Sequence, residues 1–275
     1  MDDLSQALES FNRKERNLLV RAALGHKETP LKLGTEFRER VASKLGIGPI
    51  SGDAWWATDF HISWLAGAFA IYYGDMTAVG ETGRPNPIAQ KSARRLVEGN
   101  QEDIDLVIAA GRNLILIEAK AFGAWSNAQM RSKLIHLELL RQYHDEIRVS
   151  HEHPINLHLL LTSLRAPEKL ISAPAPWSKD GAMLPWVLLD SELKGPIRTV
   201  TRCNDKGDPS ATGDRWRVLK SNSGVAGWRR ELDPAEEGDL QELSLAISSD
   251  AVPLSATRSP SRSTAWDRTA VRGRT

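Results

Sequence analysis

Cysteine is almost absent from this chain. Its 275 residues include one, Cys203, which excludes an internal disulfide and any zinc site built from several cysteines. Long apolar runs are missing too, since none approaches the roughly 20 residues that span a bilayer. The first residues lack the basic and apolar regions of a signal peptide. We therefore expect a cytoplasmic protein with no membrane partner.

An excess of charge of either sign is also missing. The chain has 36 Lys and Arg against 35 Asp and Glu, a net charge of +1, so any surface that binds nucleic acid must be local. It contains neither a G-x-x-x-x-G-K-[ST] loop nor a G-x-S-x-G elbow, so NTP hydrolysis and serine-hydrolase chemistry have no support. Its 41% hydrophobic content suffices for a substantial core.

The most informative stretch runs from residue 103 to residue 120. Two apolar runs, 104–109 and 114–117, flank the short connection Gly111-Arg112, and this pattern predicts a tight antiparallel hairpin. Gly111 would take the positive φ that a type II′ turn needs at its first central position. The sequence therefore fixes a register in which positions equidistant from the turn face each other.

In that register the charged residues of the hairpin meet at its open end. Asp105 lies opposite Glu118, and Asp103 lies opposite Lys120. Side chains alternate between the faces of a sheet, so these four share one face. The other face carries only apolar side chains: Ile104, Leu106, Ile108, Ile115 and Ile117.

Two directly opposed carboxylates destabilise a hairpin unless something neutralises them. A hard cation such as Mg²⁺ suits Asp105 and Glu118, because it takes oxygen ligands from one or two carboxylates and keeps waters for a substrate phosphate. The alternative is a salt-bridge cluster in which Lys120 neutralises Asp103 and Glu118 points to water. The hairpin geometry alone leaves both interpretations open.

The run from Asp105 to Lys120 resembles the metal-binding core of the PD-(D/E)XK nuclease superfamily, in which an acid on one strand and an acid-x-Lys pair on the next form the active site. The resemblance implies that Asp105 and Glu118 hold Mg²⁺ or Mn²⁺ with the Ala119 carbonyl, and that Lys120 assists the attacking water. This chain departs from the pattern in one respect, since Ile104 and not proline precedes Asp105.

The resemblance covers about residues 100 to 163. It implies an α/β fold with a restriction-endonuclease-like core, in which helices flank a small mixed sheet and a helical N-terminal region precedes it. It also implies a nucleic-acid partner, DNA rather than RNA, and leaves a homodimer open. A second acid-x-Lys triplet, 192–194, follows another apolar run but has no hairpin partner with a facing acid.

Helical patterns dominate the chain before the hairpin. Spacing of apolar residues predicts one or two helices over 4–24, a helix over 35–45 with Thr35 as N-cap, an apolar buried helix over 54–73, and a further helix over 88–97.

Three residues of this region are candidates for the site. Asp59 and His61 fall near the start of the helix expected over 54–73, where a carboxylate interacts favourably with the positive end of the helix dipole. A capping role and a buried, hydrogen-bonded histidine compete with a role in the site. The superfamily often adds an acid from a helix before the core strands, which makes Glu36 a candidate, although no spacing singles it out.

After the hairpin, Ser126 or Asn127 can cap a helix that runs to about Ile147. Gln129 and Lys133 lie one turn apart near its start, the end closest to Lys120 if the helix folds back on the sheet. In the superfamily a Gln or Lys at this place orients the water or contacts DNA.

A buried strand is expected over 155–161, joined in parallel to the hairpin by the preceding helix. Further strands are expected over 186–189, 197–201 and 216–219, the last two as a hairpin. From about Asp233 the chain is rich in Ser, Thr, Pro, Ala and Arg, which predicts a disordered tail.

The expected organisation is thus a helical region over 1–99, a nuclease-like core over 100–232 and a tail over 233–275. The leading hypothesis is a Mg²⁺-dependent nuclease. The first alternative is a noncatalytic module that keeps the fold and binds nucleic acid or protein. The second is a helical interaction protein in which residues 54–73 bind a partner.

Overall fold

We analysed a computed structural model of the chain. It describes residues 3–220 except 82, 90–91, 100–101, 121–124, 126–127, 150, 165, 168–169, 172, 174–176, 178–182 and 191–197. The expected tail over 233–275 and the triplet over 192–194 lie outside these residues. No helix in the described part is both long enough and apolar enough to cross a membrane.

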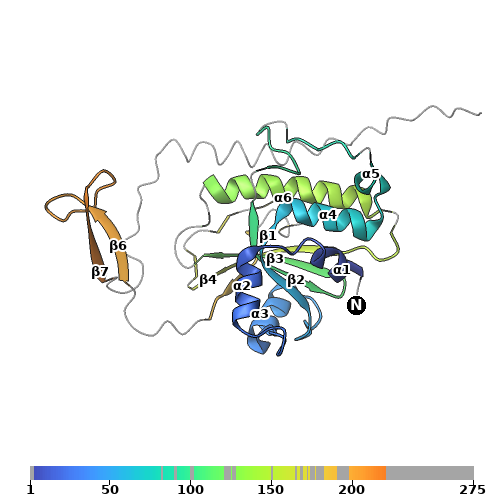
Figure 1. Ribbon diagram of the computed structural model, residues 1–275, viewed down its shortest axis with the longest axis horizontal. Coiled ribbons are helices and arrows are strands. Elements are labelled where there is room, and N and C mark those ends of the chain that lie inside the picture. The colour runs from blue at the N-terminus through green and yellow to red at the C-terminus, as the bar shows by residue number, and fades with distance from the viewer. Residues whose placement is uncertain are drawn as a thin grey trace, which may run out of the picture. The chain divides into compact units, whose positions relative to one another are not determined.

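A five-stranded mixed sheet organises the molecule (Figure 1). Its strands run in the order β1-β2-β3-β4-β5; β1 to β3 pair antiparallel, whereas β3 to β5 pair parallel. This arrangement confirms an α/β protein with a mixed sheet. The strands are β1 Trp55–His61, β2 Asp103–Ala110, β3 Asn113–Lys120, β4 Asn156–Ser163 and β5 Trp186–Leu188.

The central hairpin has the predicted register. Leu106 pairs with Ile117 and Ala110 with Asn113, which leaves Gly111 and Arg112 as a two-residue loop. Gly111 has φ +57°, and Arg112 is not among the residues with positive φ, as a type II′ turn requires. The pairing is regular as far as Leu106 and Ile117, one residue short of Asp105 and Glu118.

Helices cover both faces of the sheet. On one face, α1, α4 and α6 enclose the larger core, which includes Phe60, Phe69, Leu116 and Leu137. On the other face, α3 packs over Ile108, Ile115 and Ile117. The helices are α1 Asp3–Glu9, α2 Glu15–Ala23, α3 Thr35–Leu45, α4 Ile62–Tyr73, α5 Met76–Val79 and α6 Ala128–Ile147.

One apolar residue of the hairpin lies on the unexpected face. Leu106, Ile108, Ile115 and Ile117 share one face as predicted, which is the face covered by α3, but Ile104 belongs to the larger core with α4 and α6. The strict alternation of β2 therefore fails near its start. Its partner strand is irregular at the same level, because Asp59 has φ +53° and Phe60 pairs with Ile104.

The prediction of one helix over 54–73 is wrong. Residues Trp55–His61 form β1, an outer strand that pairs with β2, and the helix begins only at Ile62. The region before residue 100 thus contributes a strand as well as helices. The helix predicted over 88–97 is also wrong, because its described residues form turns and an isolated bridge between Ile88 and Arg95.

Other elements follow the sequence closely. The first helical stretch is two helices, and α3 has its predicted bounds, with Gly46 in the left-handed conformation after it. The N-cap of α3 is Gly34 rather than Thr35. Helix α6 connects β3 to the parallel strand β4 as expected. Strands β6 (Arg198–Cys203) and β7 (Arg215–Lys220) form the predicted second hairpin, a separate two-stranded sheet.

Candidate functional site

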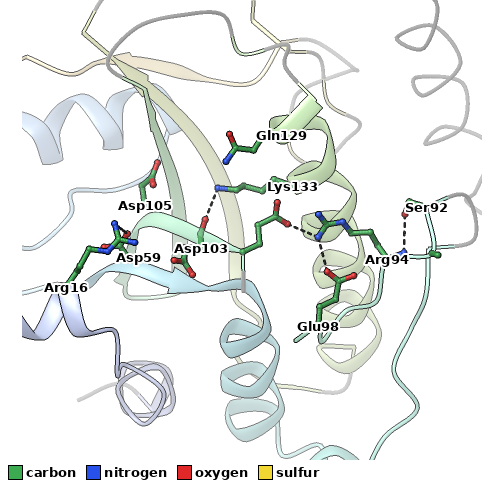
Figure 2. Close-up of a pocket in the computed structure, with 11 residues that line it drawn as sticks. Arg16, Asp59, Ser92, Arg94, Glu98, Asp103, Asp105, Gln129 and Lys133 are labelled. Carbon is green, nitrogen blue, oxygen red and sulfur yellow. Dashed lines mark hydrogen bonds and ion pairs between the residues drawn. The ribbon is translucent and has the colours of Figure 1, made fainter. Parts of the chain in front are cut away.

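A polar cavity of about 690 Å³ opens where β2 begins (Figure 2). β1 and β3 end at the same edge of the sheet, because both run antiparallel to β2. The cavity receives side chains from α2, β1, β2, α6 and the segment before β2. Its lining residues are Arg16, Asp59, Ser92, Ala93, Arg94, Glu98, Glu102, Asp103, Asp105, Gln129 and Lys133.

Glu118 is a buried carboxylate beside this cavity. The residue is only 5% exposed, and its Oε2 accepts a hydrogen bond from Lys133 Nζ at 2.7 Å. Its other oxygen, Oε1, is buried and has no hydrogen-bond partner among the residues that the structure describes. Burial raises the pKa of Glu118 to about 7; Lys133 opposes this shift and nearby Asp105 adds to it. A buried carboxylate oxygen without a partner is costly, so this atom is suited to a cation.

Asp105 lies close to Glu118 at the end of the hairpin. Its Oδ2 accepts a hydrogen bond from the Ala119 N–H at 2.7 Å, and its charge contributes to the raised pKa of Glu118. The structure therefore brings together the two carboxylates that the sequence paired. The backbone of Ala119, whose carbonyl is the third predicted ligand, is held by the same contact.

Lys120 ends β3 next to this pair. Its Nζ lies 5.0 Å from the centre of the Trp125 ring, a favourable cation–π contact. Burial lowers the pKa of Lys120, with Glu118 opposing and Lys133 adding to the shift. Two ammonium groups, Lys120 and Lys133, thus accompany the two carboxylates.

Asp103 is neutralised by partners other than Lys120. Its Oδ2 accepts a hydrogen bond from Lys14 Nζ at 2.7 Å, and its Oδ1 is hydrogen-bonded to His61 Nδ1. Its carbonyl accepts a second hydrogen bond from Lys133 at 2.7 Å. The N-terminal segment and β1 therefore hold Asp103 at the cavity, and the predicted Lys120–Asp103 pair is not among the ion pairs of the described residues.

Of the other predicted site residues, some lie at the cavity and one does not. Gln129 lines the cavity from the first turn of α6, with an exposed side chain. Glu36 is exposed on α3, 3.8 Å from Arg40, and does not line the cavity. The structure thus brings Gln129 and Lys133 to the site but not Glu36.

Asp59 was a candidate for the site, with helix capping as the competing role. It lies in β1, lines the cavity and pairs with Arg16 at 3.3 Å. The N-cap of α4 is His61, which makes no side-chain capping hydrogen bond. Sequence reasoning missed two acidic residues of the cavity, Glu98 and Glu102, because no local pattern signals a residue that reaches the site from the segment before β2.

A second charged network closes the cavity on the side of α6 (Figure 2). Arg94 Nη1 lies 3.0 Å from Glu98 and 3.2 Å from Glu102, and Glu102 also contacts buried His136 at 3.2 Å. Both acidic and basic side chains line the cavity: Asp59, Glu98, Glu102, Asp103 and Asp105, with Arg16, Arg94 and Lys133. Such a lining can bind a charged, hydrated ligand, whereas an apolar ligand has little to contact here.

The described residues contain no group of three or more His, Cys, Asp or Glu side chains arranged to hold a metal. Mg²⁺ is often bound by only one or two carboxylates, with waters and substrate oxygens completing its shell. Asp105 and Glu118, with the Ala119 carbonyl, fit that smaller set, since Glu118 has a buried oxygen to offer. Comparisons with family models, curated proteins and solved structures gave no match.

Proposed function

We propose that the protein is a metal-dependent nuclease that hydrolyses phosphodiester bonds, with DNA as the favoured substrate. The observation that carries the proposal is the buried oxygen of Glu118 that has no hydrogen-bond partner among the described residues. Glu118 interacts with Asp105 and Lys133, which both line the open polar cavity, and with Lys120. Phosphodiester hydrolysis needs carboxylates that hold a metal ion, next to cationic groups that stabilise the charge on the phosphate.

The order of elements supports the same proposal. A hairpin bearing the acids is followed by a crossover helix and a parallel strand, the order expected of a restriction-endonuclease-like core. Helix α6 also delivers Gln129 and Lys133 to the end of β3, where the resemblance implies a water-orienting or DNA-contacting residue.

Each residue then has a role. Asp105, Glu118 and the Ala119 carbonyl hold Mg²⁺ or Mn²⁺, which when bound lowers the pKa of water and stabilises charge on the phosphate. Lys120 orients the attacking water, and its lowered pKa makes its ammonium a readier proton donor than an ordinary lysine. Lys133 orients Glu118, while Gln129 contacts the substrate or the water.

One observation favours a second candidate, a noncatalytic module that binds nucleic acid. Lys133 already neutralises Glu118 at 2.7 Å, so the acidic site does not need a metal for its charge balance. In that case the cavity would serve binding without hydrolysis.

The test is cleavage of supercoiled plasmid, linear duplex and single-stranded RNA, each with Mg²⁺ and with EDTA. We expect Mg²⁺-dependent cleavage by the wild type, with a loss of at least about 100-fold in Asp105→Asn and Lys120→Met. Lys44→Met, at an exposed position of α3, is the matched control and should keep full activity. Retarded gel mobility without cleavage would favour the binding module, and neither cleavage nor retardation would favour the helical interaction protein.

A further inference from the structure

The β6–β7 hairpin is a strongly basic ribbon. Its two strands, Arg198–Cys203 and Arg215–Lys220, contain no acidic residue, although the chain as a whole has a net charge of only +1. Arg198, Arg202, Arg215 and Arg217 are all exposed. The two strands therefore carry a local excess of positive charge, whereas the loop that joins them carries Asp205, Asp208 and Asp214.

The register gathers apolar and basic side chains on one face of the ribbon. Val200 pairs with Val218, and Arg202 pairs with Trp216. By alternation, Arg198 shares this face. Val200 and Trp216 are each 69% exposed and Val218 is 49% exposed. An indole of this size left in water beside arginines indicates a binding surface.

The ribbon is organised before it binds anything. Arg202 donates from Nε to the Gly213 carbonyl, and Asn204 Oδ1 accepts hydrogen bonds from the backbone of Lys206 and Asp208 at 3.0 and 2.9 Å. A Cβ at Gly213 would collide with the backbone of Cys203. These contacts fix the loop end, so binding costs little ordering entropy.

We propose that the β6–β7 ribbon binds a single-stranded segment of nucleic acid, with Trp216 stacking on an unpaired base while Arg198 and Arg202 contact phosphates. Arginines beside an exposed aromatic ring match the phosphates and the bases of a single strand. A duplex keeps the faces of its bases covered, so a flat exposed indole favours an unpaired segment. The proposal rests on the proposed function, because it names how that nuclease would hold its substrate.

The experiment measures binding by fluorescence polarisation, using the full chain in EDTA, a labelled single-stranded oligothymidylate and a duplex of equal length. We expect the wild type to bind the single strand more tightly than the duplex, and we expect its affinity to fall with rising salt. Trp216→Ala should weaken binding about tenfold or more, the loss expected for one stacked base. Trp216→Phe should restore most of the affinity.

Two arginines provide a matched pair. Arg198→Ala removes a cation from the face of Trp216, whereas Arg217→Ala removes one from the opposite face of the same ribbon. We expect the first to weaken binding clearly more than the second. Equal losses, unchanged binding by Trp216→Ala, or equal affinity for duplex and single strand would each overturn the proposal.

The outcome is separable from the proposed function. EDTA prevents metal-dependent cleavage, so a protein that is not a nuclease would still show Trp216-dependent binding. Conversely, if Mg²⁺-dependent cleavage depends on Asp105 and Lys120 while Trp216→Ala binds as the wild type does, the ribbon proposal fails and the nuclease proposal stands.

Discussion

Lys133 Nζ lies 2.7 Å from Glu118 Oε2, and both side chains are more than nine-tenths buried, with exposures of 9% and 7%. The same ammonium donates to the Asp103 carbonyl at 2.7 Å. One lysine from α6 therefore ties the helix to both strands of the hairpin. It occupies one oxygen of Glu118, while the other has no partner in the described part of the chain. Lys133 therefore favours the ionised carboxylate without blocking it.

Replacing this lysine should impair cation binding most strongly near neutral pH. Lys133→Met keeps the length of the side chain but removes the charge that opposes the raised pKa of Glu118, so a larger fraction of Glu118 is protonated at pH 7. We expect the apparent Kd for Mg²⁺, measured by calorimetry at pH 7, to rise about tenfold. The Kd should recover at higher pH, where Glu118 is ionised in the variant as well. Lys44→Met is the control, and an unchanged Kd would show that Lys133 does not act through Glu118.

The raised pKa of Glu118 also predicts how stability depends on pH. Its pKa of about 7 in the folded state exceeds its ordinary value of 4.5, so the folded state binds the proton more tightly. Without metal, this group should cost stability on the order of 3 kcal/mol as pH rises from about 4.5 to 7. Urea unfolding in EDTA should show this fall, and Glu118→Gln should remove it.

Magnesium should reverse that cost only where Glu118 is ionised. At pH 8 we expect Mg²⁺ at about 100 times its Kd to add about 2.7 kcal/mol to the free energy of unfolding. The increment at pH 6 should be much smaller, because protonated Glu118 is a poor ligand. Equal increments at the two pH values would mean that the ion binds elsewhere. The same measurement with Ca²⁺ in place of Mg²⁺ tests whether the increment depends on the size of the ion.

The backbone at Asp59 provides a prediction about strain near the cavity. Asp59 and Ala93, which both line the cavity, have positive φ angles of +53° and +54°. This backbone conformation costs a residue with a Cβ about 1–2 kcal/mol. Ala93→Gly should therefore raise the free energy of unfolding by about 1 kcal/mol. Asp59→Gly should likewise be more stable than Asp59→Ala by about 1 kcal/mol, although both lose the carboxylate. Equal stabilities would show that neither backbone is strained.

The sequence predicted well wherever local contacts decide the structure. The hairpin at Gly111, its register and the bounds of α3 all follow from turn and capping residues close in the chain. The same local reasoning paired Asp105 with Glu118. It also placed Gln129 and Lys133 near the start of α6, at the end of the helix closest to Lys120.

The prediction from sequence failed where pairing with a distant strand decides the local structure. No proline interrupts the apolar run over 54–73, so a single helix was the natural prediction. Strand β1 exists because Phe60 and His61 pair with Ile104 and Asp103 of β2. Lys14 reaches Asp103 through the same tertiary packing. No pattern local to Lys14 could indicate that contact.

His144 lies at the end of α6 far from the cavity. It should give the stability of the fold a pH dependence opposite to that of Glu118. Its ring is 2% exposed, and its Nε2 accepts from the Tyr73 hydroxyl at 2.9 Å, since that hydroxyl oxygen already accepts from the Ile155 N–H. Burial lowers the pKa of His144 to about 4, against its ordinary value of 6.5; Asp145 opposes the shift, while Arg148 and Arg141 add to it.

This histidine should destabilise the fold as pH falls. The unfolded state takes up the proton first, below about pH 6.5, so stability should be lost progressively from there towards pH 4. His144→Gln keeps an acceptor for Tyr73 but cannot titrate, and its unfolding free energy should fall less steeply over that window. His153→Gln, at a side chain 58% exposed, is the control and should follow the wild type. A His144→Gln profile parallel to the wild type would contradict the assignment, because the acid sensitivity would then arise elsewhere in the chain.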